Sequence, residues 1–300
     1  MRKLEKALAV LLFLPLGIFL SVLAETLSPA EEKTAIVCFV DGKAWVLDPG
    51  TKERKEIDLF VWLKTGGTVE TSADAKLVIA FSTGDRYEVS GSAKAIVGQA
   101  GLTTVSGPVK KLTPTPVMPK IVSLSQGARP GSRMSGIRLR GAKQVISDLY
   151  PGDGAAVFAD EAVLTFSHMG KAERFRVELE DEPGNNILSI ETTSSEVGVS
   201  PGILKPGANY YWSVRTLETD KPSTVVDAVF STITEEEAKT LKAFRSQAFQ
   251  SRDAAELLLL SEIDITLGLR KEACETLKAA LALSSGNDKI KKAASLLGCK

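Results

Sequence analysis

The segment Leu204-Lys205-Pro206-Gly207-Ala208-Asn209-Tyr210-Tyr211-Trp212-Ser213-Val214 gives the clearest indication of fold in this chain of 300 residues. Its Pro-Gly pair favours a turn, and large side chains then alternate with their neighbours, as in a β-strand that buries one face. Short apolar runs separated by turn clusters continue on both sides, at residues 162–166, 175–179, 187–190, 197–199 and 225–230. This spacing predicts a β-sandwich over residues 144–234.

The same segment resembles the fibronectin type III signature, in which a Leu, a Pro-Gly turn and a Tyr six residues after that Leu open the penultimate strand. The resemblance implies that Tyr210 is a tyrosine corner whose hydroxyl bonds to backbone, with Trp212 and Val214 in the core on the same face. Residues 144–234 contain no cysteine, which excludes an immunoglobulin-type disulfide.

Two features of this domain invite a catalytic or metal-binding interpretation. His168, the only histidine, lies next to Ser167, but a triad requires a spatial arrangement that neighbours in sequence do not supply. The acidic run 178–182 precedes a Pro-Gly turn and lacks the spacing of an EF-hand, so we expect the solvated face of a hairpin. We therefore expect His168 at a strand edge, and no catalytic residue, metal or cofactor.

Residues 33–107 show a second series of short strands. Asp41-Gly42 separates the apolar runs 36–40 and 44–47, which is a hairpin signal, and alternation continues around Gly84. The pattern predicts antiparallel β-structure without a helix.

These residues resemble the FecR-like domain, an all-β module of bacterial envelope proteins, over about 70 residues. The likeness lies in a glycine pair followed by a threonine, an alternating apolar strand and a glycine turn. The matching residues are Leu63, Gly66, Gly67, Val69, Thr71, Ala75, Leu77, Ile79, Phe81, Gly84, Tyr87 and Val89. The resemblance implies a periplasmic or surface module.

Residues 235–300 have helical periodicity. Thr234 and Glu237 form a capping box that predicts a helix start, and further helices are expected at 254–267, 271–283 and 288–297. In residues 254–287 the packing positions are occupied by Leu257, Leu260, Gly268, Ala273, Leu277 and Ala280. By these residues the segment resembles one tetratricopeptide repeat, whose first helix lines a groove. The resemblance implies partner contacts at Glu256, Leu259 and Ile263; alternatively, the segment is a helical cap.

Residues 108–143 are expected to form a basic, proline-rich linker. Five of the 13 prolines lie between residues 108 and 130, and residues 110–143 contain eight basic residues and no Asp or Glu. Arg129, Arg133, Arg138 and Arg140 are candidate contacts for an anionic cell-wall polymer. Alternatively, the segment is a solvated linker.

The N-terminus predicts export. Basic residues precede an apolar run at residues 7–24, so residues 1–24 are expected to be a cleaved signal peptide or, alternatively, an uncleaved membrane anchor. In an exported chain Cys274 and Cys299 could pair, whereas Cys38 lies in an apolar run where a buried thiol is expected.

Composition and motifs together favour a noncatalytic protein. The 37 basic and 37 acidic residues cancel, which argues against nucleic acid as a partner, and no nucleotide-binding or metalloprotease motif occurs. We expect an exported cell-envelope protein, periplasmic or at the cell surface, that acts as a protein–protein interaction or scaffolding module. One alternative is a polysaccharide or peptidoglycan binder that uses Trp45 or Trp62, and another is a carboxylate-dependent hydrolase.

Overall fold

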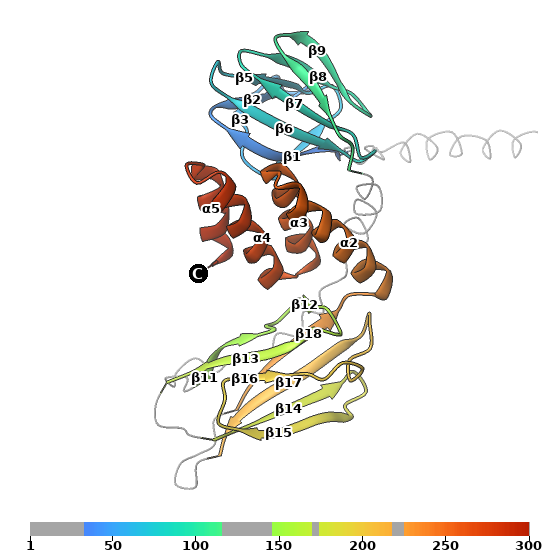
Figure 1. The fold of residues 1–300 in the computed structure, drawn as a ribbon, viewed down its shortest axis with the longest axis vertical. Coiled ribbons are helices and arrows are strands. Elements are labelled where there is room, and N and C mark those ends of the chain that lie inside the picture. Colours follow the sequence, from blue (N-terminus) through green and yellow to red (C-terminus); the bar gives the residue numbers. More distant parts are fainter. Residues whose placement is uncertain (1–32, 116–145, 170–173, 218–224, 300) are drawn as a thin grey trace, which may run out of the picture. The chain divides into compact units, whose positions relative to one another are not determined.

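The computed structural model describes residues 33–115, 146–169, 174–217 and 225–299. The chain from Thr34 onward is one compact unit, mainly β with a C-terminal helical segment, as expected (Figure 1). The proposed signal segment 1–24 and the arginines of the basic linker lie outside the described residues.

Two five-stranded sheets form the first domain (Figure 1). One has the order β10 (Val109–Leu112), β7 (Arg86–Ser90), β6 (Lys76–Phe81), β1 (Lys33–Asp41) and β4 (Trp62–Lys64). The other has the order β3 (Arg54–Glu56), β2 (Ala44–Leu47), β5 (Thr68–Thr71), β8 (Lys94–Val97) and β9 (Leu102–Ser106). Residues 35–40 of β1 and 77–81 of β6 are buried without alternation, so both faces of this sheet are covered.

The first domain extends beyond the expected boundary at residue 107. Strand β10 pairs with β7 in antiparallel register, so residues 109–112 belong to the sheet rather than to the linker. Lys111 of this strand forms an ion pair with Asp85 at 2.9 Å, and the Thr115 amide donates to the Gly84 carbonyl at 2.8 Å. Two of the eight basic residues of the predicted linker, Lys110 and Lys111, are thus held on a sheet edge.

The second domain is a fibronectin type III-like β-sandwich. Its smaller sheet has the order β11 (Ile146–Tyr150), β13 (Val163–His168) and β16 (Glu196–Gly198). Its larger sheet has the order β12 (Ala155–Val157), β18 (Val225–Thr232), β17 (Asn209–Thr216), β14 (Phe175–Asp181) and β15 (Asn186–Thr192). β12 pairs with β18 in parallel, whereas the other recorded pairs are antiparallel.

The predicted tyrosine corner is confirmed. The Lys205 amide donates to the Tyr210 hydroxyl at 2.6 Å, and Trp212 and Val214 are buried on the same face of β17. The Trp212 indole N–H donates to the Pro151 carbonyl at 2.8 Å, so its one polar group is satisfied in the core.

The two features that invited a catalytic or metal-binding interpretation are in the predicted positions. His168 is the exposed last residue of β13, with its ring 4.9 Å from that of Phe175. The acidic run 178–182 belongs to β14 and its hairpin turn. Within the part of the chain that the structure describes, no group of three or more metal-ligating side chains is present.

Four described helices complete the chain: α2 (Glu235–Ser251), α3 (Ala254–Leu267), α4 (Arg270–Leu283) and α5 (Asp288–Leu297). Thr234 and Glu237 form the predicted capping box at the start of α2. Cys274 and Cys299 form a disulfide that links α4 to the chain beyond α5, and Cys38 is a buried free thiol. Among the described helices, none combines the length and the apolar character needed to span a membrane.

Candidate functional site

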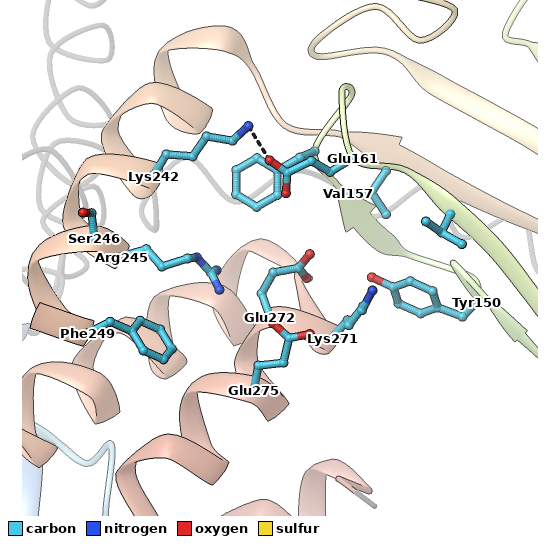
Figure 2. Close-up of a pocket in the computed structure, with 12 residues that line it drawn as sticks. Tyr150, Val157, Glu161, Lys242, Arg245, Ser246, Phe249, Lys271, Glu272 and Glu275 are labelled. Carbon is cyan, nitrogen blue, oxygen red and sulfur yellow. Dashed lines mark ion pairs between the residues drawn. The ribbon is translucent and has the colours of Figure 1, made fainter. Parts of the chain in front are cut away.

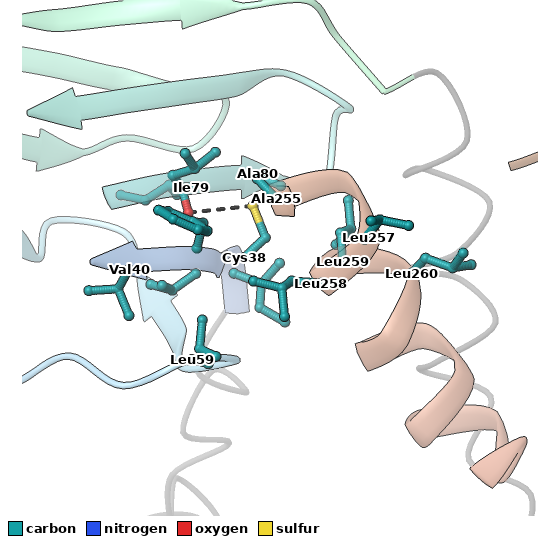
Figure 3. Close-up of a cluster of buried hydrophobic side chains, with 14 of the residues drawn as sticks. Cys38, Val40, Leu59, Ile79, Ala80, Ala255, Leu257, Leu258, Leu259 and Leu260 are labelled. Atoms are coloured by element: carbon teal, nitrogen blue, oxygen red, sulfur yellow. Dashed lines mark hydrogen bonds between the residues drawn. The ribbon is translucent and has the colours of Figure 1, made fainter. Parts of the chain in front are cut away.

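Helix α3 is leucine-rich and is buried on most of its sides, because it is packed within the chain. Residues 257–260 are four consecutive buried leucines, and they share one apolar cluster with Cys38 and Val40 of β1 and Ile79 of β6 (Figure 3). A helix with apolar residues on most sides must be covered on those sides. Here the first β domain provides part of that cover, and α4 packs against α3 as well.

The structure places the three predicted partner contacts in this interior. Leu259 and Ile263 are 2% and 5% exposed and belong to the apolar cluster. The Glu256 carboxylate lies 3.0 Å from the Arg86 guanidinium of β7. Another protein could touch these residues only by displacing the surrounding parts of the same chain.

Polar contacts reinforce the packing of the helices on the first domain. The Asn287 side-chain amide donates to the Val40 carbonyl at 2.8 Å while its oxygen caps α5. Lys292 pairs with Asp58 at 2.6 Å, and Lys289 pairs with Glu56 at 3.2 Å.

The helices also contact the sandwich. The Ala156 amide of β12 donates at 3.0 Å to the Gly268 carbonyl in the turn between α3 and α4. Lys242 of α2 forms ion pairs with Asp160 and Glu161 of the sandwich at 2.7 and 2.6 Å. Its ammonium group also lies 5.1 Å from the ring centroid of the buried Phe158.

A cavity of about 540 Å³ lies where the sandwich meets α2 and α4 (Figure 2). The sandwich contributes Tyr150, Val157, Phe158, Glu161 and Val163, and the helices contribute Lys242, Arg245, Ser246, Phe249, Lys271, Glu272 and Glu275. No histidine or cysteine is among these lining residues, so the cavity offers charge, hydrogen bonds and aromatic rings. Its volume lies within the range of about 300–1,000 Å³ typical of ligand pockets.

Arg245, which lines the cavity, forms an ion pair with the buried Asp264. One terminal nitrogen of Arg245 contacts both carboxylate oxygens of Asp264 at 3.0 Å, and Asp264 has no exposed surface. Burial raises the pKa of Asp264 to about 7 although the Arg245 charge opposes this rise. Arg245 therefore forms its ion pair with Asp264, which does not line the cavity.

Acidic side chains of α4 face the cavity without such partners. Neither Glu272 nor Glu275 forms an ion pair with any described residue, and the Glu272 Oε2 atom is buried without a hydrogen-bond partner there. Burial raises the pKa of Glu272, although the nearby Arg245 and Lys271 charges oppose this rise. Burial also raises the pKa of Tyr150, and the nearby Glu272 and Glu275 charges add to that rise, so its hydroxyl stays protonated.

The tryptophans proposed as sugar contacts are only partly exposed. The Arg54 guanidinium lies 4.1 Å from the Trp45 ring centroid and occupies one face of that ring, whereas Trp62 packs against the apolar cluster of the first domain. The proposed basic contacts Arg129, Arg133, Arg138 and Arg140 lie outside the described residues.

Sequence reasoning did not identify the cavity residues Tyr150, Arg245, Glu272 and Glu275. The available signal was Asp264, a carboxylate in the leucine-rich helix segment 254–267, because a buried carboxylate favours a cation nearby. Nothing in the sequence placed β11 beside α4.

Comparisons with known proteins give no family. No protein-family model matches the chain, and no curated protein matches it. One similar structure is CopC from Methylosinus trichosporium OB3b, with 17% identity over 30% of this chain and 93% of that chain, at a TM-score of 0.25. Another is the FN1-FN3 domains of chicken CNTN1, with 9% identity over 67% of this chain and 55% of that chain, at a TM-score of 0.23. At TM-scores this low, neither structure says anything about what this chain binds.

Proposed function

We propose that the protein is a noncatalytic, exported cell-envelope protein that acts as a protein–protein interaction or scaffolding module. The observation that carries the proposal is the packing of the C-terminal helices against both β domains. Through α3, Asn287 and the Gly268 turn, three segments that could each be a separate module become one compact unit. A scaffold benefits from such packing because binding surfaces on different modules then keep a fixed spacing.

Sequence features support the cellular setting of this proposal. The basic and then apolar N-terminus favours export, and the first domain resembles the FecR-like module of bacterial envelopes. The disulfide between Cys274 and Cys299 suits an oxidising compartment outside the cytoplasm.

Fractionation of the native host tests this setting. We expect the intact chain in the periplasmic or envelope fraction, and a matched version without residues 1–24 in the cytosol. Recovery of the full-length chain in the cytosol, with residues 1–24 still attached, would contradict export.

Crosslinking followed by affinity purification from that fraction tests the scaffolding role. The intact chain is the right bait, because removal of residues 234–300 would uncover the apolar surface around Cys38 and Val40 and create artificial binding. We expect a reproducible set of envelope proteins. A catalytic activity that copurifies and disappears on one Asp or Glu substitution would overturn the noncatalytic proposal.

A further inference from the structure

We propose that the cavity between the sandwich and helices α2 and α4 binds an organic cation, the alkylguanidinium or alkylammonium group found on arginine and lysine side chains. This inference deepens the proposed function by naming the chemistry that a partner protein would present. The evidence is the charge, the aromatic lining and the size of the cavity.

Some charged side chains of the cavity have ion-pair partners and others have none. Of its three basic residues, Lys242 is paired with Asp160 and Glu161, Arg245 donates to both carboxylate oxygens of Asp264, and Lys271 has no ion-pair partner among the described residues. The acidic Glu272 and Glu275 have no ion-pair partner among the described residues. Helix α4 thus contributes two unpaired carboxylates and one unpaired ammonium group to the cavity, and the carboxylates are in excess on this side.

The position of Glu272 favours a ligand that donates hydrogen bonds. Figure 2 shows its carboxylate and the Tyr150 hydroxyl turned toward the same space. One carboxylate oxygen is buried without a hydrogen-bond partner among the described residues, which is costly for a charged acceptor. Rotation about the terminal side-chain bond, which has broad minima, exchanges the two oxygens. A cationic donor would satisfy this carboxylate, whereas an anion would meet two like charges.

Aromatic rings complete the match to an organic cation. Tyr150 lies on the sandwich side of the cavity, and the Phe249 ring, 44% exposed, lies on the α2 side. A guanidinium or ammonium group over such rings gains cation–π attraction, and the alkyl stem of the side chain packs against their edges. A volume of about 540 Å³ also has room for the stem and adjoining backbone.

Lys271 provides a further test, because its ammonium group competes with a bound cation for the carboxylates of the cavity. It lines the cavity, it is exposed, and it forms no ion pair with a described residue. Removing this charge should strengthen the binding of a cation and weaken the binding of an anion.

The experiment is a ligand-observed NMR titration of the full chain with three probes: propylguanidinium, butylammonium and the neutral n-butylurea. We expect saturable binding of the two cations and at least tenfold weaker binding of the urea, the scale of a lost charge-assisted hydrogen bond. Glu272→Gln should weaken cation binding about tenfold, Lys271→Gln should strengthen it, and the exposed Glu180→Gln should leave it unchanged.

A blocked Gly-Arg-Gly peptide distinguishes the two possible sources of the cation, a protein side chain and a free amine or guanidine. Tighter binding of the peptide than of propylguanidinium identifies a protein side chain as the natural ligand, and equal binding identifies a free amine or guanidine.

The proposal is overturned if Glu272→Gln binds the cations as tightly as the unmodified chain, if the urea binds equally well, or if Lys271→Gln weakens binding. Urea unfolding of each variant confirms that it folds, and Glu272→Gln should be at least as stable as the unmodified chain because it removes a buried unpaired charge. These results do not depend on export or on partner capture, so the proposed function and the cation site can fail separately.

Discussion

The guanidinium of Arg86 lies 3.0 Å from the carboxylate of Glu256, and the two side chains are only 4% and 6% exposed. The same guanidinium contacts Asp253, the N-cap of α3, at 3.2 Å and donates to the Thr113 carbonyl at 3.0 Å. One arginine of β7 thus holds the start of α3 and the end of the first domain together. A buried ion pair of this kind specifies a docking position more clearly than it adds stability.

Removing one member of this pair should destabilise the protein strongly. Glu256→Gln leaves the buried Arg86 charge with only the partly exposed Asp253, and we expect a loss of about 3 kcal/mol in the free energy of unfolding. Replacing both residues, as Arg86→Met with Glu256→Leu, should cost less than Glu256→Gln alone, because no unpaired charge remains buried.

Urea unfolding at pH 7 measures these differences, and Lys94→Ala is the control. Lys94 pairs with Glu70 at 3.0 Å, but both side chains are substantially exposed, so its loss should cost less than about 1 kcal/mol. A Glu256→Gln variant no less stable than Lys94→Ala would show that the buried pair does not hold the helices on the first domain.

Local signals in the sequence were sufficient to predict the helices and the corner of the sandwich. Thr234 with Glu237 marks the start of α2, and Gly268 marks the turn after α3, because each acts through hydrogen bonds or backbone geometry within a few residues. Tyr210 was predictable for the same reason, since its hydroxyl bonds to backbone five residues away.

Long-range packing was not predictable. The leucines at 257–260 indicate a helix covered on all sides, but not that β1 and β6 take part in covering it. Strand β10 was missed because it has two lysines in four residues and sits on an edge, where neither burial nor alternation marks it. Strand β11 was missed because Asp148, with a φ of 51°, interrupts its alternation. The cavity depends on bringing β11 to α4, so its residues could not be grouped from sequence.

Gly268 should be intolerant of a side chain. Its φ is 81°, and a Cβ would lie 3.2 Å from both the Ala156 nitrogen and the Gly154 carbonyl oxygen. Gly268→Ala would therefore strain the backbone and push β12 away from its hydrogen bond to the Gly268 carbonyl. We expect a loss of about 2–4 kcal/mol, from backbone strain and one broken contact.

Gly298 provides a matched control for this substitution. It also ends a helix with a positive φ, 77°, but no atom of the described residues outside its own neighbours lies within 4 Å of its would-be Cβ. Gly298→Ala should cost only the backbone strain of about 1–2 kcal/mol. Equal losses for the two variants in thermal or urea unfolding would rule out a contribution from the contact between Gly268 and the sandwich.

The three cysteines should differ sharply in reactivity. Cys38 is fully buried and burial raises its pKa to about 12, while Cys274 and Cys299 are paired. We expect a thiol reagent to label none of them in the native protein, one after unfolding, and three after unfolding with reductant. Rapid labelling of two thiols in the native protein would show that the disulfide does not form.

The disulfide should also stabilise the helical segment. It closes a loop between cysteines 25 residues apart, so the double variant Cys274→Ser with Cys299→Ser should lose about 3 kcal/mol. Reductant should destabilise the unmodified chain by a similar amount and leave the double variant unchanged. A double variant that still responds to reductant would contradict this assignment.

The buried Asp264 should make stability depend on pH. Its pKa is about 7 in the folded protein, against an ordinary value of 3.8 for an unfolded chain, because burial outweighs the charge of Arg245. Between these two values the folded state holds a proton that the unfolded state has lost. The free energy of unfolding should therefore fall as the pH rises from about 4 to 7, at up to about 1.4 kcal/mol per pH unit, and then level off. Glu262, whose pKa burial also raises to about 7, adds a slope of the same sign.

Urea unfolding between pH 4.5 and 7.5 should show a shallower slope for Asp264→Asn, the shallowest slope when Glu262→Gln is added, and no change for the exposed Glu180→Gln. If Asp264→Asn keeps the slope of the unmodified chain, then Asp264 is ionised throughout this range. Its attraction to Arg245 would then outweigh the cost of removing its carboxylate from water.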